Sequence, residues 1–75
     1  MPKLARVSGK TTIACLIKLG FKKVRQKGSH VILIKSTPEG NIGCVVPLHK
    51  ELAIGTLNGI LKQAKVSPEE FMENL

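Results

Sequence analysis

The sequence predicts an α+β fold in which two amphipathic helices pack against a three-stranded antiparallel sheet, in the order αβββα, with a short C-terminal helix. The chain has only 75 residues, which is below the usual size of a domain, so we expect residues 1–75 to form one domain with one core. Apolar residues recur at helical spacing near both ends. Between them, three strand-like segments are separated by turn-forming residues, as in an antiparallel meander.

The first helix is expected to begin at Ser8, after an extended leader at residues 1–7. Serine is a preferred N-cap residue, and Ile13 and Leu16 recur on one face of the segment that follows. Gly20 then offers a C-terminal stop, because glycine readily takes the left-handed backbone that ends many helices. The pattern therefore predicts a helix with one apolar face.

Three strands are expected next. Residues 21–27 form a polar strand that is rich in Lys and Arg, and a Gly-Ser pair at residues 28–29 connects it tightly to an apolar strand at residues 30–35. Residues 36–41 are all turn-forming types and precede a third strand at residues 42–46. The middle strand is apolar on both faces, so the sequence alone leaves open which face the helices cover.

A second amphipathic helix is expected at residues 56–64, after a loop at residues 48–55. Ser67 and Pro68 are a preferred N-cap residue and a preferred first helical residue, so they predict the start of the short last helix. The apolar face of the second helix consists of Leu57, Ile60, Leu61 and Ala64.

The charge distribution predicts a polyanionic partner. The net charge is +7, and residues 1–38 hold nine basic and no acidic side chains. Nucleic acid is the first candidate, followed by an anionic membrane surface or an acidic protein. With two Phe and no Trp or Tyr, the chain cannot build an aromatic platform for stacked bases, so contacts should be mostly to phosphate and sugar. The longest apolar run, residues 13–17, is too short to span a membrane, and we expect a cytoplasmic protein.

The two cysteines predict structural thiols. We expect Cys15 and Cys44 to be free and buried, with Cys15 half-buried at the flank of the first helix. The chain has neither C-x-x-C nor H-x-x-x-H spacing. No metal or other cofactor is therefore expected.

The most informative stretch combines a run of cations with a Gly-Ser-His turn. Four cations within six residues could form only a solvated edge strand, or they could follow the phosphates of a nucleic acid. His30 alone would more often be structural, but an imidazole beside several cations is what RNA cleavage by 2′-hydroxyl attack requires. Ser29 could orient a phosphate or cap the turn. The candidate cations are Lys22, Lys23, Arg25 and Lys27.

Two further segments are weaker candidates. Residues 9–12 resemble the end of a phosphate-binding loop but lack its first glycine, so they predict an ordinary helix start whose Lys10 could contact a phosphate. His49 could be a loop residue bonded to the backbone, or it could act with Lys50 as a second acid/base or phosphate contact.

Six segments of the chain match the pattern of a known family in order and spacing. They are Val7–Lys10, Leu19–Phe21, Arg25–Val31, Val46–Leu52, Gly55–Leu57 and Ile60–Ala64. With these segments the chain resembles the HicA family of small RNA-cleaving toxins. The resemblance implies a fold like that of double-stranded-RNA-binding domains, a sandwich of one sheet and two helices. It also implies the toxin of a type II toxin-antitoxin system, a metal-independent mRNA endoribonuclease with His30 as its catalytic residue and a HicB-like antitoxin as its partner.

Two other functions remain open at this point. The first is a module of the same fold that binds structured RNA without cutting it. The second is a protein whose basic half docks only onto an acidic protein partner. Cleavage in the presence of EDTA would separate the nuclease from the RNA-binding module. Strong salt dependence with long RNA would disfavour a protein that docks only onto an acidic protein partner.

Overall fold

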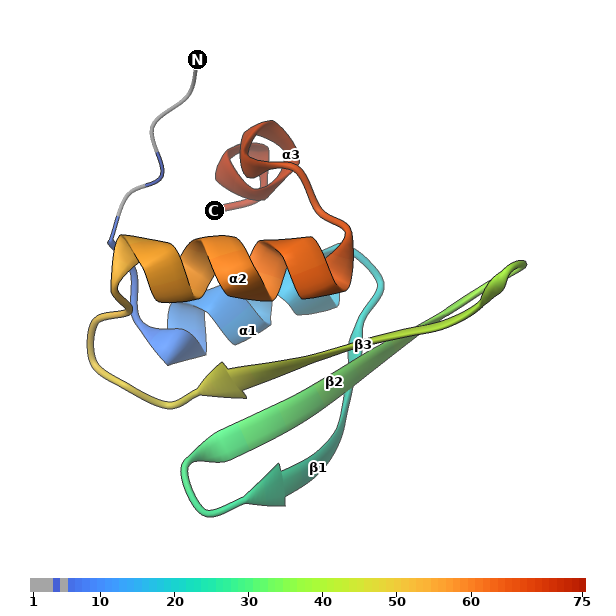
Figure 1. The fold of residues 1–75 in the computed structure, drawn as a ribbon, viewed down its shortest axis with the longest axis horizontal. Helices are drawn as coiled ribbons and strands as arrows, with labels where there is room; N and C mark the ends of the chain where they lie inside the picture. Colours follow the sequence, from blue (N-terminus) through green and yellow to red (C-terminus); the bar gives the residue numbers. More distant parts are fainter. Residues whose placement is uncertain (1–3, 5) are drawn as a thin grey trace.

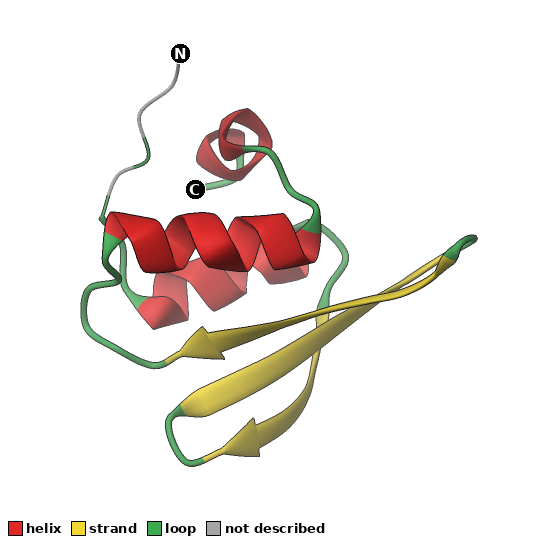
Figure 2. Cartoon of the chain, in the orientation of Figure 1, coloured by secondary structure: helices red, strands yellow, loops and turns green. Residues whose placement is uncertain are grey.

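Six elements follow one another in the computed structural model, which describes residue 4 and residues 6–75. In chain order they are α1 (Gly9–Lys18), β1 (Lys22–Lys27), β2 (His30–Thr37), β3 (Gly40–Pro47), α2 (Ile54–Ala64) and α3 (Pro68–Glu73). The predicted αβββα order with a short terminal helix is confirmed (Figures 1 and 2). Most of the expected leader, residues 1–3 and 5, lies outside the described residues.

Helix α1 begins at the predicted cap. Ser8 has extended backbone, and its Oγ accepts a hydrogen bond from the backbone N–H of Thr11 at 3.0 Å. This bond satisfies one of the N–H groups that the first turn of a helix leaves without a partner. Lys18 is the last helical residue, and Gly20 has a φ of +104°, which disfavours a side chain there.

The three strands form one antiparallel sheet in the order β1-β2-β3. Strands β2 and β3 are longer than predicted, because their pairing continues as far as Thr37 opposite Gly40 and leaves only residues 38–39 in the turn. Turn-forming residues can adopt extended backbone when a neighbouring strand bonds their N–H and C=O groups. The resulting hairpin projects beyond the ends of the helices (Figure 1).

Helices α1 and α2 lie on the same face of the sheet (Figure 1). On β2, Val31 and Leu33 are buried, whereas His30 is exposed and Ile32 is half-buried. Because successive strand residues point to opposite faces, the helices cover the face of Val31 and Leu33. The other face, which carries His30 and Ile32, is open; we call it the open face. All six residues of β1 are exposed.

The ends of α2 explain why its bounds were harder to predict than those of α1. The helix begins at Ile54, two residues before the expected start, and Ala53 at the N-cap position makes no capping hydrogen bond with its side chain. At the other end, Lys65 has a left-handed backbone with a φ of 56° and closes the helix as a glycine would. Helix α3 begins as predicted, since the Oγ of Ser67 accepts a hydrogen bond from its third residue.

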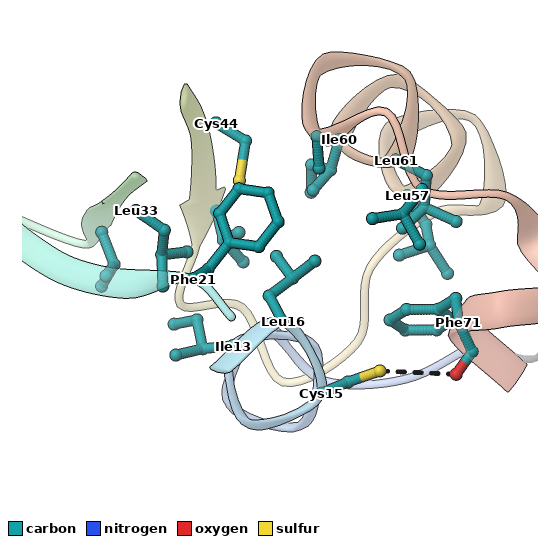
Figure 3. Packing of buried hydrophobic residues seen from close by; sticks show 14 of the residues in the cluster. Ile13, Cys15, Leu16, Phe21, Leu33, Cys44, Leu57, Ile60, Leu61 and Phe71 are labelled. Atoms are coloured by element: carbon teal, nitrogen blue, oxygen red, sulfur yellow. Dashed lines mark hydrogen bonds between the residues drawn. The ribbon is translucent and has the colours of Figure 1, made fainter. Parts of the chain in front are cut away.

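The core lies between the helices and the covered face of the sheet, and Phe21 and Phe71 are its largest side chains (Figure 3). The Cys15 Sγ donates a hydrogen bond to the backbone carbonyl of Phe71 at 3.4 Å, which links α1 to α3 (Figure 3). Cys15 is therefore only 2% exposed, and the expectation that it is half-buried was wrong. Packing of α3 over the flank of α1, which the pattern of α1 alone does not show, accounts for the difference.

Candidate nucleic-acid interface

His30 lies at the entrance to the middle strand. A two-residue loop, Gly28 and Ser29, joins β1 to β2, and Lys27 pairs with His30 at its base. Gly28 has a φ of +60°, a conformation that tight hairpin loops require and that glycine adopts without strain. The loop therefore places His30 at one end of the sheet, exposed and on the open face.

Three of the four cations of β1 share this face with His30. Directly opposed residues of an antiparallel sheet project their side chains to the same face. Because β2 places His30, Ile32 and Ile34 on the open face, their partners lie there as well. The pairs are Lys27 with His30, Arg25 with Ile32, and Lys22 with Ile34.

A β-bulge at Val24 produces this arrangement. The register shifts between Lys23 and Arg25, so the strict alternation that would group Lys23 with Arg25 and Lys27 is broken. Lys23 instead pairs with a buried residue of β2 and belongs to the other face. The bulge thus places Lys22, and not Lys23, beside the other cations of the open face.

The middle of the open face is apolar. Ile32 and Ile34 are half-buried there, and Val45 of β3, which pairs with Ile32, is 40% exposed. These side chains lie on the open face and were not among the predicted site residues. The signal was present in the sequence, because a middle strand that is apolar on both faces must expose one set of apolar residues if helices cover only the other.

A hollow of about 370 Å³ lies beside this end of the sheet. One wall comes from the start of α1 and the other from the loop after β3, which meet through a hydrogen bond from the backbone N–H of Gly9 to the carbonyl of His49 at 2.9 Å. The same loop is fixed at its far end, where the N–H of Leu52 donates to the carbonyl of Val7 at 2.8 Å. The lining residues are Ser8, Lys10, Leu48, His49 and Lys50.

The hollow and His30 are held at the same end of the sheet by backbone contacts. The N–H of Leu48 donates to the carbonyl of Ser29 at 2.6 Å, and Pro47 pairs with His30. The structure therefore brings Lys10, His49 and Lys50 together around the hollow, although Lys10 and Lys50 are 40 positions apart in the chain, and it holds the loop after β3 against Ser29.

The electrostatic field of the open face is positive. None of the three strands contains Asp or Glu; Glu39 lies at the tip of the β2–β3 hairpin, Glu51 lies in the loop after β3, and the other three acidic residues belong to α3. Across residue 4 and residues 6–75 there is one ion pair, between Arg6 Nη1 and Glu51 Oε1 at 3.7 Å, and both side chains are exposed. The cations of the open face thus lie among neutral residues.

Both cysteine thiols are unsuited to nucleophilic attack. Cys15 and Cys44 are free and buried, as predicted. Burial raises the pKa of the Cys15 thiol, an effect that nearby Lys18 partly opposes, and burial raises the pKa of Cys44 to about 11. A thiol that keeps its proton is a poor nucleophile and a poor metal ligand, so the two cysteines belong to the core.

The described residues hold neither a cluster of metal-ligating side chains nor a membrane-spanning helix. Nowhere in residue 4 or residues 6–75 do three or more His, Cys, Asp or Glu side chains come together as metal ligands would. The helices in the same residues are too short to cross a membrane.

The comparison with protein families identifies the family of the chain. A family model described as the HicA toxin of bacterial toxin-antitoxin systems matches residues 9–66. The chain belongs to the HicA family. The matched residues include His30, the cations of β1 and the loop between β3 and α2, and family membership identifies this HicA chain as a toxin with a cognate antitoxin. No curated protein matches the chain closely enough to count as a relative.

Proposed function

We propose that this HicA protein is a metal-independent endoribonuclease that cleaves mRNA in the cytoplasm, with His30 as its acid/base residue. The observation that carries the proposal is the position of His30: exposed at the end of β2, on a face that also presents Lys22, Arg25 and Lys27. Such a surface can hold a phosphate of the RNA backbone next to an imidazole.

The chemistry needs few protein groups because RNA supplies its own nucleophile. The 2′-hydroxyl oxygen forms a bond to the adjacent phosphorus, and the bond from that phosphorus to the 5′-oxygen of the next nucleotide breaks. The 2′-hydroxyl loses its proton and the leaving 5′-oxygen gains one, so the products are a 2′,3′-cyclic phosphate and a free 5′-hydroxyl. His30 would transfer one of these protons, and the neighbouring cations would stabilise the additional negative charge on the phosphate oxygens.

The exposure of His30 makes a direct test possible. His30→Ala should lower the rate of cleavage of a labelled RNA by about 100-fold or more. The thermal midpoint should fall by less than about 4 °C, because exposed side chains contribute little to stability. RNA affinity should change little, since the cations of β1 remain. Wild type and variant are compared in EDTA, and a variant that cuts at the wild-type rate would refute the catalytic role.

His49→Ala is the matched control, because it removes the only other imidazole of the chain. We expect it to cost less activity than His30→Ala, since His49 lies in the loop after β3 and not on the open face. Equal losses would instead mean that the two imidazoles act as an acid/base pair. RNA that binds with salt-sensitive affinity but is never cut would favour the alternative of a non-catalytic RNA-binding module.

We further propose that the partner is a HicB-like antitoxin that covers His30 and the cations of β1. The three strands contain no acidic residue, so a complementary partner surface would be negative. Hydrogen exchange of the complex with the cognate antitoxin tests this. We expect the amides of β1 and of residues 28–32 to be protected. Protection confined to α3, with His30 left open, would contradict inhibition by occlusion.

A further inference from the structure

We propose that the hollow at the His30 end of the sheet binds one nucleotide of the RNA substrate, with its phosphate at Lys10 and Lys50 and its base against Leu48. The inference rests on the proposed nuclease function and adds to it a subsite that gives cleavage a preference for the base bound there. Three features of the hollow support it: its size and lining, its charge, and its rigid walls.

The size and lining fit a single nucleotide. Small-ligand sites have volumes of roughly 300–1,000 Å³ and combine an apolar lining with a few polar groups. The hollow, at about 370 Å³, lies near the lower end of that range, and Leu48 lies among the cationic and polar groups of Lys10, His49 and Lys50. A nucleotide has the matching chemistry, because its base has apolar faces and its phosphate is an anion.

The anion would be attracted by side chains more than by the helix end. In the first turn of α1, the N–H of Gly9 bonds the carbonyl of His49, and the N–H groups of Thr11 and Thr12 bond the Oγ and the carbonyl of Ser8. The ammonium groups of Lys10 and Lys50, unlike these N–H groups, remain available to an anion. Glu51 follows Lys50 in the chain, but its carboxylate pairs with Arg6. The ammonium groups of Lys10 and Lys50 therefore supply the positive charge of the hollow.

The walls are in direct backbone contact, which makes the site preorganised. A Cβ atom built on Gly9 would lie 2.0 Å from the carbonyl oxygen of Pro47 and 3.1 Å from the Cα of Leu48. The start of α1 and the loop after β3 can approach this closely only because residue 9 has no side chain. A pocket with fixed walls loses little conformational freedom when a ligand binds.

The location connects the hollow to cleavage. Leu48 lies against Ser29 through the 2.6 Å hydrogen bond described above, and Ser29 precedes His30 in the chain. The hollow and His30 therefore lie at the same end of the sheet, and an RNA strand with one nucleotide in the hollow would continue past the edge where His30 lies. The base in this subsite would set which bonds are presented to His30.

Nucleoside 5′-monophosphates test the subsite without any cleavage, because they contain no phosphodiester bond. The four common ones, and inorganic phosphate as a control, are titrated into the isotope-labelled chain and followed by NMR. We expect shifts concentrated at the amides of Ser8, Lys10 and residues 48–50, with affinities near the millimolar range and a difference between bases. Shifts spread evenly over the lysines of the chain, or binding of inorganic phosphate as tight as that of every nucleotide, would overturn the inference.

A charge-matched pair of variants completes the experiment. Lys10→Gln with Lys50→Gln should weaken nucleotide binding by about tenfold or more. Lys62→Gln with Lys65→Gln removes the same charge from exposed residues at the C-terminal end of α2, the end away from the loop after β3 (Figure 1). This pair should change nucleotide binding by less than about twofold, because solvent screens distant exposed charges. Equal losses in the two variants would mean diffuse attraction and would overturn the subsite.

The outcome separates the subsite from the nuclease proposal. A chain that cleaves RNA in EDTA but shows no local nucleotide binding keeps the proposed function and loses the subsite. A chain that binds nucleotides in the hollow but never cleaves RNA keeps the subsite and loses the nuclease.

Discussion

Replacing Gly9 by alanine should destabilise the protein, although alanine is the better helix former. The added Cβ would sit 2.0 Å from the carbonyl oxygen of Pro47 and 3.0 Å from its carbonyl carbon. Both are backbone atoms, so no side-chain rotation can relieve the overlap. The start of α1 and the end of β3 would have to separate by more than an ångström, and the 2.9 Å hydrogen bond from Gly9 to His49 would be lost or lengthened.

The size of the effect follows from three contributions. Overpacking of a tight contact costs about 1–3 kcal/mol, and loss of the hydrogen bond costs about 1 kcal/mol. The gain in helix propensity from Gly to Ala is at most about 1 kcal/mol. The net loss is therefore about 1–3 kcal/mol, which lowers the thermal midpoint of a domain of this size by roughly 5–20 °C.

Gly59→Ala is the matched control, because it makes the same chemical change inside a helix. Gly59 is exposed within α2, and an added Cβ would meet no atom within 4 Å. Alanine should therefore stabilise the protein by about 0.5–1 kcal/mol. Thermal unfolding followed by circular dichroism measures both variants. A Gly9→Ala midpoint at or above that of the wild type would refute the reasoning.

Two other predictions concern charge and thiols. If RNA contacts Lys22, Arg25 and Lys27 and up to two further cations, a plot of log K against log salt should have a slope of about −2 to −3.5 for single-stranded RNA; a flat plot, measured by fluorescence anisotropy, would contradict phosphate binding. Cys44, whose pKa burial raises from 9.0 to about 11, should stabilise the fold fully below pH 9 and progressively less as pH rises towards 11. The free energy of unfolding, measured with denaturant, should thus fall more steeply over pH 9–11 in the wild type than in Cys44→Ala. Equal dependence on pH in the two proteins would contradict the stabilising role of the protonated Cys44 thiol.

The starts of the two helices that have a capping serine could be predicted from the sequence. Ser8 and Ser67 begin α1 and α3 as expected, because each makes its capping bond within its own helix. The start of α2 and the length of the β2–β3 hairpin could not be predicted as well. Ala53 gives no cap, and the extended backbone near Thr37 depends on pairing with β3, which is a property of the sheet and not of the segment.

The candidate site could be predicted as a set of residues but not as an arrangement. The cluster of cations before His30 is visible in the sequence, whereas the bulge at Val24, which selects Lys22 over Lys23 for the open face, is set by the register with β2. The hollow is also a tertiary feature. Its two walls come from the start of α1 and the loop after β3, and their contact depends on the absence of a side chain at Gly9.

The complete exposure of β1 has a consequence for how such a toxin diversifies. No side chain of this strand is buried, so most substitutions in it leave the core untouched and change stability only slightly. Backbone pairing with β2 holds the strand in place. Lys23, Val24 and Gln26, which are not among the cations of the open face, can therefore change without loss of the fold or of the surface around His30, and an antitoxin that contacts them can change in step.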